Sequence, residues 1–203
     1  MRCPFCYNPT LVISENIKEK NLIPEDEVLA FLKKRKKYLD GVVITGGEPL
    51  MQSDLKSFCK KLKRMGYVIK LDTNGLLPSL LQDLILEKLI DYIAMDLKGP
   101  VENYSKFCGV DANPQDIADS IKIIKNSGLP YEFRSTLVKS LHKEGDIEAM
   151  AGAIRGASLY YLQNFSKQDI LVGSDFSGRP FPASELERFK SVAEKSVKKC
   201  LIR

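Results

Sequence analysis

Residues 42–50 read Val42-Val43-Ile44-Thr45-Gly46-Gly47-Glu48-Pro49-Leu50, a β-branched run that ends in two glycines. Such a short apolar run is typical of a strand in a parallel sheet that is covered on both faces. A helical pattern follows at about 53–65, and Gly66 ends it. The strand, the glycine turn and the helix form one β-then-α unit, so this stretch predicts an α/β fold.

The same unit recurs along the chain, and its repetition favours a parallel sheet or barrel with right-handed crossovers. A length of 203 residues is ordinary for one domain. We expect a single domain over 1–203, with a core at about 1–165 and a C-terminal extension with a helix at about 166–203. Further strands are expected at 67–73, 91–97, 131–138 and 158–163, and further helices at 24–41, 78–88, 114–126, 145–155 and 183–199.

Composition narrows the class of protein. Hydrophobic residues make up 44% of the chain and charged residues 28%, which is usual for a globular domain. No apolar run approaches 18 residues, so we expect no membrane partner, and five cysteines indicate a reducing cytoplasm. The net charge of +5 comes partly from basic runs at 33–37 and 60–64. We interpret these runs as solvated helix faces, with an acidic partner or nucleic acid as the less favoured alternative.

Polar residues and glycines gather at the ends of the predicted strands. The carboxyl ends of parallel strands carry the functional residues of such folds. Each residue alone could belong to a turn or a surface pair, but a sheet does not need all of them on one rim for stability. They are Gly46, Gly47, Glu48, Asp72, Thr73, Asn74, Asp96, Lys98, Arg134, Ser135, Thr136, Gln163 and Asn164.

Several kinds of chemistry are excluded by what the sequence lacks. It contains neither a GxxxxGK[ST] phosphate loop nor a GxGxxG motif. Its one histidine, His142, is expected to be an exposed loop residue, so neither a histidine metal cluster nor a Ser-His-Asp triad is available. We therefore do not expect acid–base hydrolysis.

Two cysteines stand two positions apart at the start of the chain, in Cys3-Pro4-Phe5-Cys6. Thiolates at this spacing can hold one metal centre from a single loop. Two thiolates do not complete such a site, so further ligands must come from elsewhere, from an added molecule or from residues outside these 203. The other cysteines are expected to be structural, with Cys108 in a distant loop; they are Cys59, Cys108 and Cys200.

Together these segments resemble the radical S-adenosylmethionine (SAM) superfamily, and in particular its glycyl-radical-enzyme activases. Cys3, Phe5 and Cys6 match the end of that family's Cys-x3-Cys-x-aromatic-Cys motif. Residues 45–50 are similar to the family's Gly-Gly-Glu-Pro segment, and 71–75 and 94–98 look like two further activase segments. The resemblance covers about 1–165 and implies a partial, open TIM-type β/α barrel of parallel strands. It also implies a further cysteine four positions before Cys3 and a preceding first strand, so we expect the sequence to be incomplete at its N-terminus.

The resemblance also implies the cofactors and the residues that bind them. A [4Fe–4S] cluster, with Cys3 and Cys6 as its ligands here, would hold SAM at an open iron. The carbonyls of Gly46 and Gly47 and the Asp72 carboxylate would then receive the SAM ammonium, and Lys98 would offset its carboxylate. The full set of expected cofactor-binding residues is Phe5, Tyr7, Gly46, Gly47, Glu48, Asp72, Asn74, Asp96, Lys98, Arg134 and Gln163.

The activity that the resemblance implies is reductive cleavage of SAM to a 5′-deoxyadenosyl radical, which generates a glycyl radical on a partner enzyme. Relatives that activate pyruvate formate-lyase carry a histidine near 163–165, where this chain has Gln-Asn-Phe. This difference favours anaerobic ribonucleoside-triphosphate reductase, through its glycine loop, as the partner. Reduced flavodoxin or ferredoxin would be the electron donor.

Three alternatives remain open from the sequence. The chain could be a catalytically incomplete form of the fold, in which the two cysteines bind zinc or nothing. It could be a radical SAM enzyme that acts on a small molecule or RNA, although its basic runs lack the interleaved aromatics that stack on bases. A thioredoxin-like role for Cys3 and Cys6 is the least favoured, because it leaves the strand-end residues unexplained.

Overall fold

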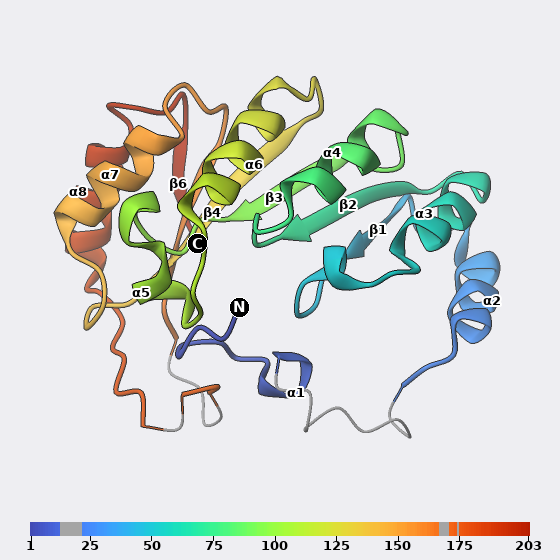
Figure 1. Cartoon of the computed structure of the whole chain (residues 1–203), viewed down its shortest axis with the longest axis horizontal. Coiled ribbons are helices and arrows are strands. Elements are labelled where there is room, and N and C mark those ends of the chain that lie inside the picture. The colour runs from blue at the N-terminus through green and yellow to red at the C-terminus, as the bar shows by residue number, and fades with distance from the viewer. Residues whose placement is uncertain (13–21, 167–170, 174) are drawn as a thin grey trace.

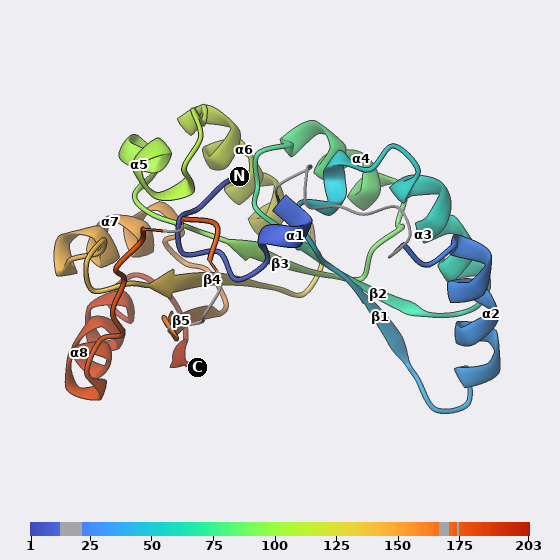
Figure 2. The ribbon, with the colours of Figure 1, turned by 90° about the horizontal axis from the view of Figure 1, so that it is seen from below.

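The computed structural model describes residues 1–12, 22–166, 171–173 and 175–203. Its centre is a six-stranded sheet in which every neighbouring pair is parallel and the strands follow in the order β1-β2-β3-β4-β5-β6. The sheet is open and curved, and helices follow one another along its outer side (Figures 1 and 2). The predicted α/β fold, a partial barrel of parallel strands, is confirmed. The strands are β1 (Gly41–Ile44), β2 (Val68–Thr73), β3 (Tyr92–Asp96), β4 (Tyr131–Leu137), β5 (Tyr160–Asn164) and β6 (Cys200–Ile202).

Helices and short turns connect these strands and lie close to the predicted ranges. Proline starts several of them, because its fixed φ suits the first helical position and its missing N–H leaves no donor unpaired there. No helix among the described residues is long and apolar enough to span a membrane. The elements are α1 (Pro9–Val12), α2 (Glu25–Arg35), η3 (Pro49–Met51), α3 (Leu55–Arg64), α4 (Pro78–Leu86), η4 (Val101–Asn103), α5 (Tyr104–Cys108), α6 (Pro114–Asn126), α7 (Glu144–Ala153) and α8 (Ala183–Ala193).

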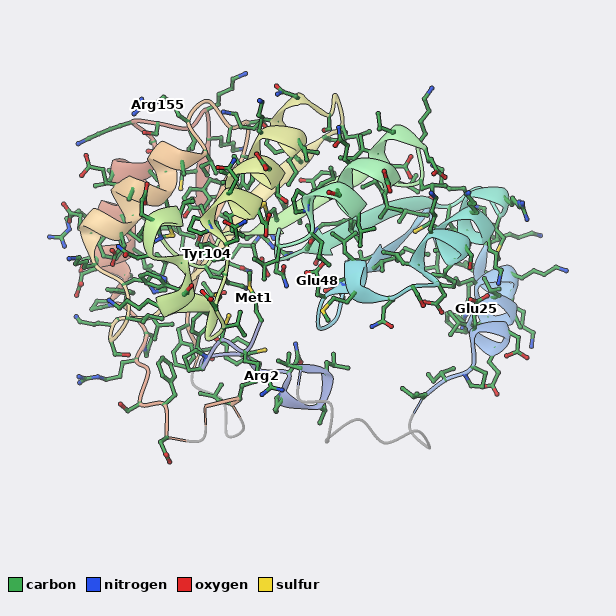
Figure 3. The ribbon with its side chains drawn as sticks, viewed as in Figure 1. Met1, Arg2, Glu25, Glu48, Tyr104 and Arg155 are labelled. Atoms are coloured by element: carbon green, nitrogen blue, oxygen red, sulfur yellow. The ribbon has the colours of Figure 1, made fainter. Side chains whose placement is uncertain are left out.

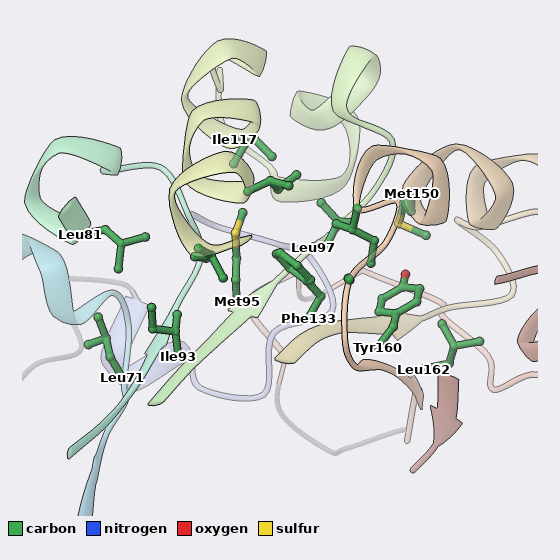
Figure 4. Packing of buried hydrophobic residues seen from close by; sticks show 14 of the residues in the cluster. Leu71, Leu81, Ile93, Met95, Leu97, Ile117, Phe133, Met150, Tyr160 and Leu162 are labelled. Atoms are coloured by element: carbon green, nitrogen blue, oxygen red, sulfur yellow. The ribbon is translucent and has the colours of Figure 1, made fainter. Parts of the chain in front are cut away.

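The core lies between the sheet and its outer helices. Successive residues of a strand point to opposite faces of the sheet. In β2 to β5 one set of alternating side chains is apolar and packs under the helices, as Figure 4 shows for Leu71, Met95 and Phe133. The other set points to the concave face and is largely polar or charged. This alternation places Asp72, Asp96 and Arg134 away from the core.

Three details differ from the sequence-based expectations. The run at 42–45 is not covered on both faces, since Val43 is 55% exposed, and β1 is also an edge strand of the sheet. The last helix ends at Ala193, and β6 follows it in parallel register with β5. The helix expected at 24–41 is shorter, because α2 ends at Arg35.

Candidate functional site

A cavity of about 300 Å³ opens at the carboxyl ends of the strands, beneath the N-terminal segment. Figure 3 shows Glu48, after β1, and Met1, on the N-terminal segment, and both line this space. The structure brings all thirteen predicted site residues to the cavity wall, and what each one binds stays a prediction. They are Cys3, Phe5, Cys6, Tyr7, Gly46, Gly47, Glu48, Asp72, Asn74, Asp96, Lys98, Arg134 and Gln163. Met1, Asn8, Val12 and Thr45 also line the cavity and were not among the expected site residues. Thr73 and Thr136, which were expected on the rim but not among the cofactor-binding residues, line it too.

The cysteine loop is a tight turn, since the amide of Cys6 donates to the carbonyl of Cys3 at 3.0 Å. The C-terminal extension holds the loop from outside. The Val172 amide donates to the Cys6 carbonyl at 3.1 Å, and the Gly173 amide donates to the Pro4 carbonyl at 3.0 Å. Two elements far apart in sequence therefore fix the backbone that presents both thiols to the cavity.

Cys108 was expected in a distant loop, but it is the last residue of α5 and lies beside the cysteine loop. Its carbonyl accepts from the Arg2 amide at 2.9 Å, which brings the end of α5 against the cysteine loop. Gly109 makes this approach possible, because a Cβ there would lie 2.2 Å from the Arg2 carbonyl oxygen. The Cys108 thiol is buried and donates to the Val110 carbonyl at 3.3 Å. Its contacts within the protein agree with a structural role.

The described residues contain no group of three or more His, Cys, Asp or Glu side chains arranged to hold a metal ion. Cys3 and Cys6 are therefore a pair of candidate thiol ligands, and among the described residues no third candidate is grouped with them. Cys3 is 5% exposed, and burial raises its pKa to about 11, although nearby Lys98 acts in the opposite direction. Its thiol is consequently protonated near neutral pH until a metal displaces the proton.

A chain of four charged side chains crosses the cavity floor. The Arg134 guanidinium donates from Nε to Asp96 at 2.9 Å and from an Nη to Asp72 at 3.1 Å, and Lys98 Nζ donates to Asp96 at 2.9 Å. Burial opposes ionisation of Asp96, but Lys98 and Arg134 outweigh it and lower the pKa of the carboxyl group. Burial likewise acts to lower the pKa of Lys98, and the Asp96 charge outweighs it and raises that pKa. Asp96 and Lys98 are therefore both held in their charged forms.

Asp72 leaves one acceptor free within this chain of charges. Its Oδ2 is bonded to Arg134, whereas its buried Oδ1 has no hydrogen-bond donor among the described residues. Lys70 Nζ lies 3.5 Å from Oδ1, close enough for an ion pair but without hydrogen-bond geometry. A buried acceptor without a donor is costly. Asp72 Oδ1 thus fits a ligand that brings a cationic N–H group into the cavity.

Glu48 is bonded to the protein rather than left free for a ligand. Its carboxylate accepts from the Asn74 amide at 2.7 Å, the Thr73 hydroxyl at 2.8 Å and the Leu50 amide at 3.2 Å. It is 8% exposed, and burial raises its pKa, although these three donors act to lower it. Glu48 therefore ties the turn after β1 to the end of β2.

Gly46 and Gly47, the two residues before Glu48, each require glycine on different structural grounds. Gly46 has φ +144°, a backbone conformation that other L-residues rarely adopt. At Gly47 a Cβ would lie 2.7 Å from the carbonyl oxygen of Leu11. The missing side chain of Gly47 thus leaves room for the Leu11 carbonyl of α1.

His142 is buried, at 4% exposure, and the expectation of an exposed loop residue is wrong. Its Nδ1 accepts from the Val138 amide at 3.1 Å, and its Nε2 lies 2.9 Å from the Lys98 carbonyl oxygen. Its ring packs beside Phe107, with 5.0 Å between ring centroids, and meets Phe5 edge-on at 6.4 Å. Sequence reasoning could not find these contacts, because a single histidine in a polar loop carries no periodic signal.

Residues 1–151 match the family model of the Radical SAM superfamily. The chain belongs to the radical SAM superfamily. Over 212 aligned residues it is 32% identical to "Putative glycyl-radical enzyme activating enzyme MJ1227" of Methanocaldococcus jannaschii, covering 100% of this chain and 84% of that protein. It is also 30% identical over 170 residues to 7-carboxy-7-deazaguanine synthase of Methanopyrus kandleri, covering 71% of this chain and 66% of the synthase.

Solved structures share the fold at low sequence identity. Streptococcus suis SuiB bound to S-adenosylmethionine has a TM-score of 0.75 at 15% identity, over 100% of this chain and 47% of SuiB. A domain of pyruvate-formate lyase-activating enzyme from Bacteroides vulgatus has a TM-score of 0.64 at 19% identity, over 80% of this chain and 98% of that domain.

The superfamily works with a [4Fe–4S] cluster and SAM, which are the cofactors that the sequence predicted. The cavity fits SAM in its donor set. Asp72 Oδ1 is an unpaired acceptor for an ammonium group, and Lys98 is a cation for a carboxylate. For the cluster, the chain supplies the thiolates of Cys3 and Cys6 on the same cavity wall.

Proposed function

We propose that this protein is a radical SAM activase that generates a glycyl radical on anaerobic ribonucleoside-triphosphate reductase. The proposal rests mainly on the cavity of about 300 Å³. The cysteine loop and the Asp72–Arg134–Asp96–Lys98 chain of charges both line it. The 32% identity to the M. jannaschii protein named as an activating enzyme supports the choice of activase over other radical SAM enzymes.

In this proposal the protein's own residues bind and orient the cofactors. Cys3 and Cys6 hold the cluster, and Asp72 Oδ1 accepts from the SAM ammonium. Lys98 neutralises the SAM carboxylate, while Asp96 and Arg134 keep Lys98 and Asp72 in place. When bound, the cluster would pass one electron from the reduced donor to SAM, and the chemistry supplied would be reductive cleavage of the sulfonium bond, which leaves methionine and drives hydrogen removal from a glycine Cα of the partner.

The site needs no general base, because the reaction depends on positioning and on excluding water. The only described imidazole, on His142, is already bonded on both nitrogens outside the cavity wall. Aromatic packing closes the site beside the cysteine loop, where Tyr7 stacks on Phe165 at 5.8 Å and accepts from the Ser166 amide. The proposed electron donor is a reduced flavodoxin or ferredoxin in the cytoplasm.

The test is anaerobic reconstitution with iron and sulfide, followed by incubation with SAM, a reductant and the reductase. We expect about four irons per chain and an EPR doublet from a glycyl radical on the reductase. Cys3→Ser and Cys6→Ser should each abolish the doublet, whereas Cys59→Ser, on a buried cysteine of α3 outside the cavity, should retain it. One zinc or no metal per chain would instead favour a catalytically incomplete form of the fold.

A second candidate is a radical SAM enzyme with a small-molecule substrate. The 30% identity to the 7-carboxy-7-deazaguanine synthase of M. kandleri favours it. Release of 5′-deoxyadenosine without any glycyl doublet on the reductase would support this candidate and count against the activase.

A further inference from the structure

Lys98 is held by its backbone as well as by its side chain. The Lys98 amide donates to the Tyr104 hydroxyl at 3.0 Å, and that hydroxyl donates to the Asp96 carbonyl at 3.1 Å. The Ser135 hydroxyl donates to the Leu97 carbonyl at 2.5 Å. His142 reaches the Lys98 carbonyl oxygen at 2.9 Å. Buried side chains from β4, α5 and the turn before α7 therefore fix the short segment that carries Lys98 into the cavity.

The hydrogen bonds of His142 define its tautomer. The Val138 amide can only donate, so Nδ1 must accept and carries no proton. The remaining ring proton is then on Nε2, which donates to the Lys98 carbonyl. The imidazole thus links the end of β4 to the turn after β3, two segments that meet at the cavity.

The same ring also touches the cysteine loop. Phe5, which lies between Cys3 and Cys6, meets the His142 ring edge-on with 6.4 Å between centroids. Phe5 is 3% exposed, and Phe176 packs on its other side at 6.3 Å. His142 is therefore in contact both with the backbone of Lys98 and with the loop that presents the thiols.

We propose that His142 is a positioning residue that sets the Lys98 ammonium relative to the cysteine loop, through its Nε2–H bond to the Lys98 carbonyl and its packing on Phe5. The proposal rests on the proposed function, because Lys98 matters to the reaction only if it receives the SAM carboxylate. His142 would thus affect SAM affinity although it does not line the cavity.

A buried histidine with both nitrogens bonded could also serve stability alone. Two isosteric changes separate these roles. In His142→Gln the amide NH₂ takes the place of Nε2 and can still donate to the Lys98 carbonyl, while the acceptor for Val138 is lost. In His142→Asn the side-chain oxygen takes the place of Nδ1 and can still accept from Val138, while the donor to Lys98 is lost.

The first measurement uses the reconstituted protein with SAM. We expect His142→Asn to weaken SAM binding about tenfold, which corresponds to the loss of about one hydrogen bond. The SAM affinity of His142→Gln should stay within about twofold of wild type. Tyr104→Phe, which keeps the ring but removes the hydroxyl, should also weaken SAM binding about tenfold. Melting temperatures of all the variants establish that each one folds. Equal SAM affinity in the two His142 variants would overturn the proposal, whether both are lowered or both are unchanged.

The second measurement needs neither cofactor. Hydrogen exchange of the Lys98 amide, followed by NMR on protein labelled with ¹⁵N-lysine, reports directly on the segment. The amide should exchange faster in His142→Asn than in His142→Gln, and equal rates in the two would overturn the link between His142 and Lys98. If wild type fails to bind SAM while the exchange rates differ as expected, the proposed function is wrong and the positioning of Lys98 by His142 still stands.

Discussion

Replacing Glu48 by glutamine should loosen the junction between the first two strand ends. In the native protein one carboxylate oxygen accepts from the Leu50 amide and the Thr73 hydroxyl, and the other accepts from the Asn74 amide. A glutamine has only one acceptor oxygen, and its NH₂ group must face one of these donors. Glu48→Gln therefore leaves at least one buried N–H group without a partner.

The size of the effect follows from the bonds that are lost. A hydrogen bond to a charged group contributes about 1.5–3 kcal/mol, and an unsatisfied buried donor costs about 1–3 kcal/mol. Removing the charge also relieves the desolvation that raises the pKa of Glu48, which offsets part of this loss. We expect a net destabilisation of about 2 kcal/mol, or about 4–8 °C in melting temperature for a chain of this size.

Thermal unfolding of Glu48→Gln at about pH 8, followed by circular dichroism, measures this effect. Glu187→Gln is the matched control, because Glu187 is exposed on α8, and its melting temperature should stay within about 1 °C of wild type. If Glu48→Gln also melts within about 1 °C of wild type, the Glu48 carboxylate does not hold the two strand ends together.

Three further predictions concern neighbouring groups. Gly47→Ala places a Cβ 2.7 Å from the Leu11 carbonyl oxygen. It should therefore lower the free energy of unfolding by about 1–3 kcal/mol. Gly152→Ala on α7 is the control and should not lower it, because no atom lies within 4 Å of the added Cβ. Arg134→Lys cannot span both of its carboxylates and should weaken SAM binding at least about tenfold, a result that unchanged affinity would contradict. Burial lowers the pKa of His142 in the folded protein, and Asp146 opposes the shift while Lys106 reinforces it. The unfolded chain therefore binds the proton more readily than the folded one. Stability should fall as pH drops from about 6.5, the unfolded value, through the lower folded pKa. The melting temperature of wild type should therefore drop over that window relative to His142→Gln. Parallel curves would show that folding does not lower the pKa of His142.

Much of the site could be predicted because parallel strands bring their carboxyl ends to one rim in chain order. Asp72, Asp96 and Arg134 come from successive strands, so their meeting follows from the strand pattern alone. The residues that support the site are different. His142 and Lys98 are 44 positions apart, and nothing in the polar segment around either one indicates that they touch.

Glu48 shows a second limit of the sequence. An acid after two glycines suggested a ligand contact, but its oxygens are occupied by donors on its own turn and on the next strand end. At Gly47 the missing Cβ leaves room for the Leu11 carbonyl, and the expected contact of the Gly47 carbonyl with SAM stays a prediction. The sequence pattern placed both residues correctly at the cavity. Only the three-dimensional structure shows which protein groups they contact there.

The proposed function requires that the cavity hold SAM beside a cluster bound by the cysteine loop. Its most direct test is the amount of 5′-deoxyadenosine that the anaerobically reconstituted protein releases from SAM in the presence of a low-potential reductant. We expect release by wild type and by Cys59→Ser, and none by Cys6→Ser. Equal release by wild type and Cys6→Ser, or no release by wild type protein that carries about four irons, would contradict it.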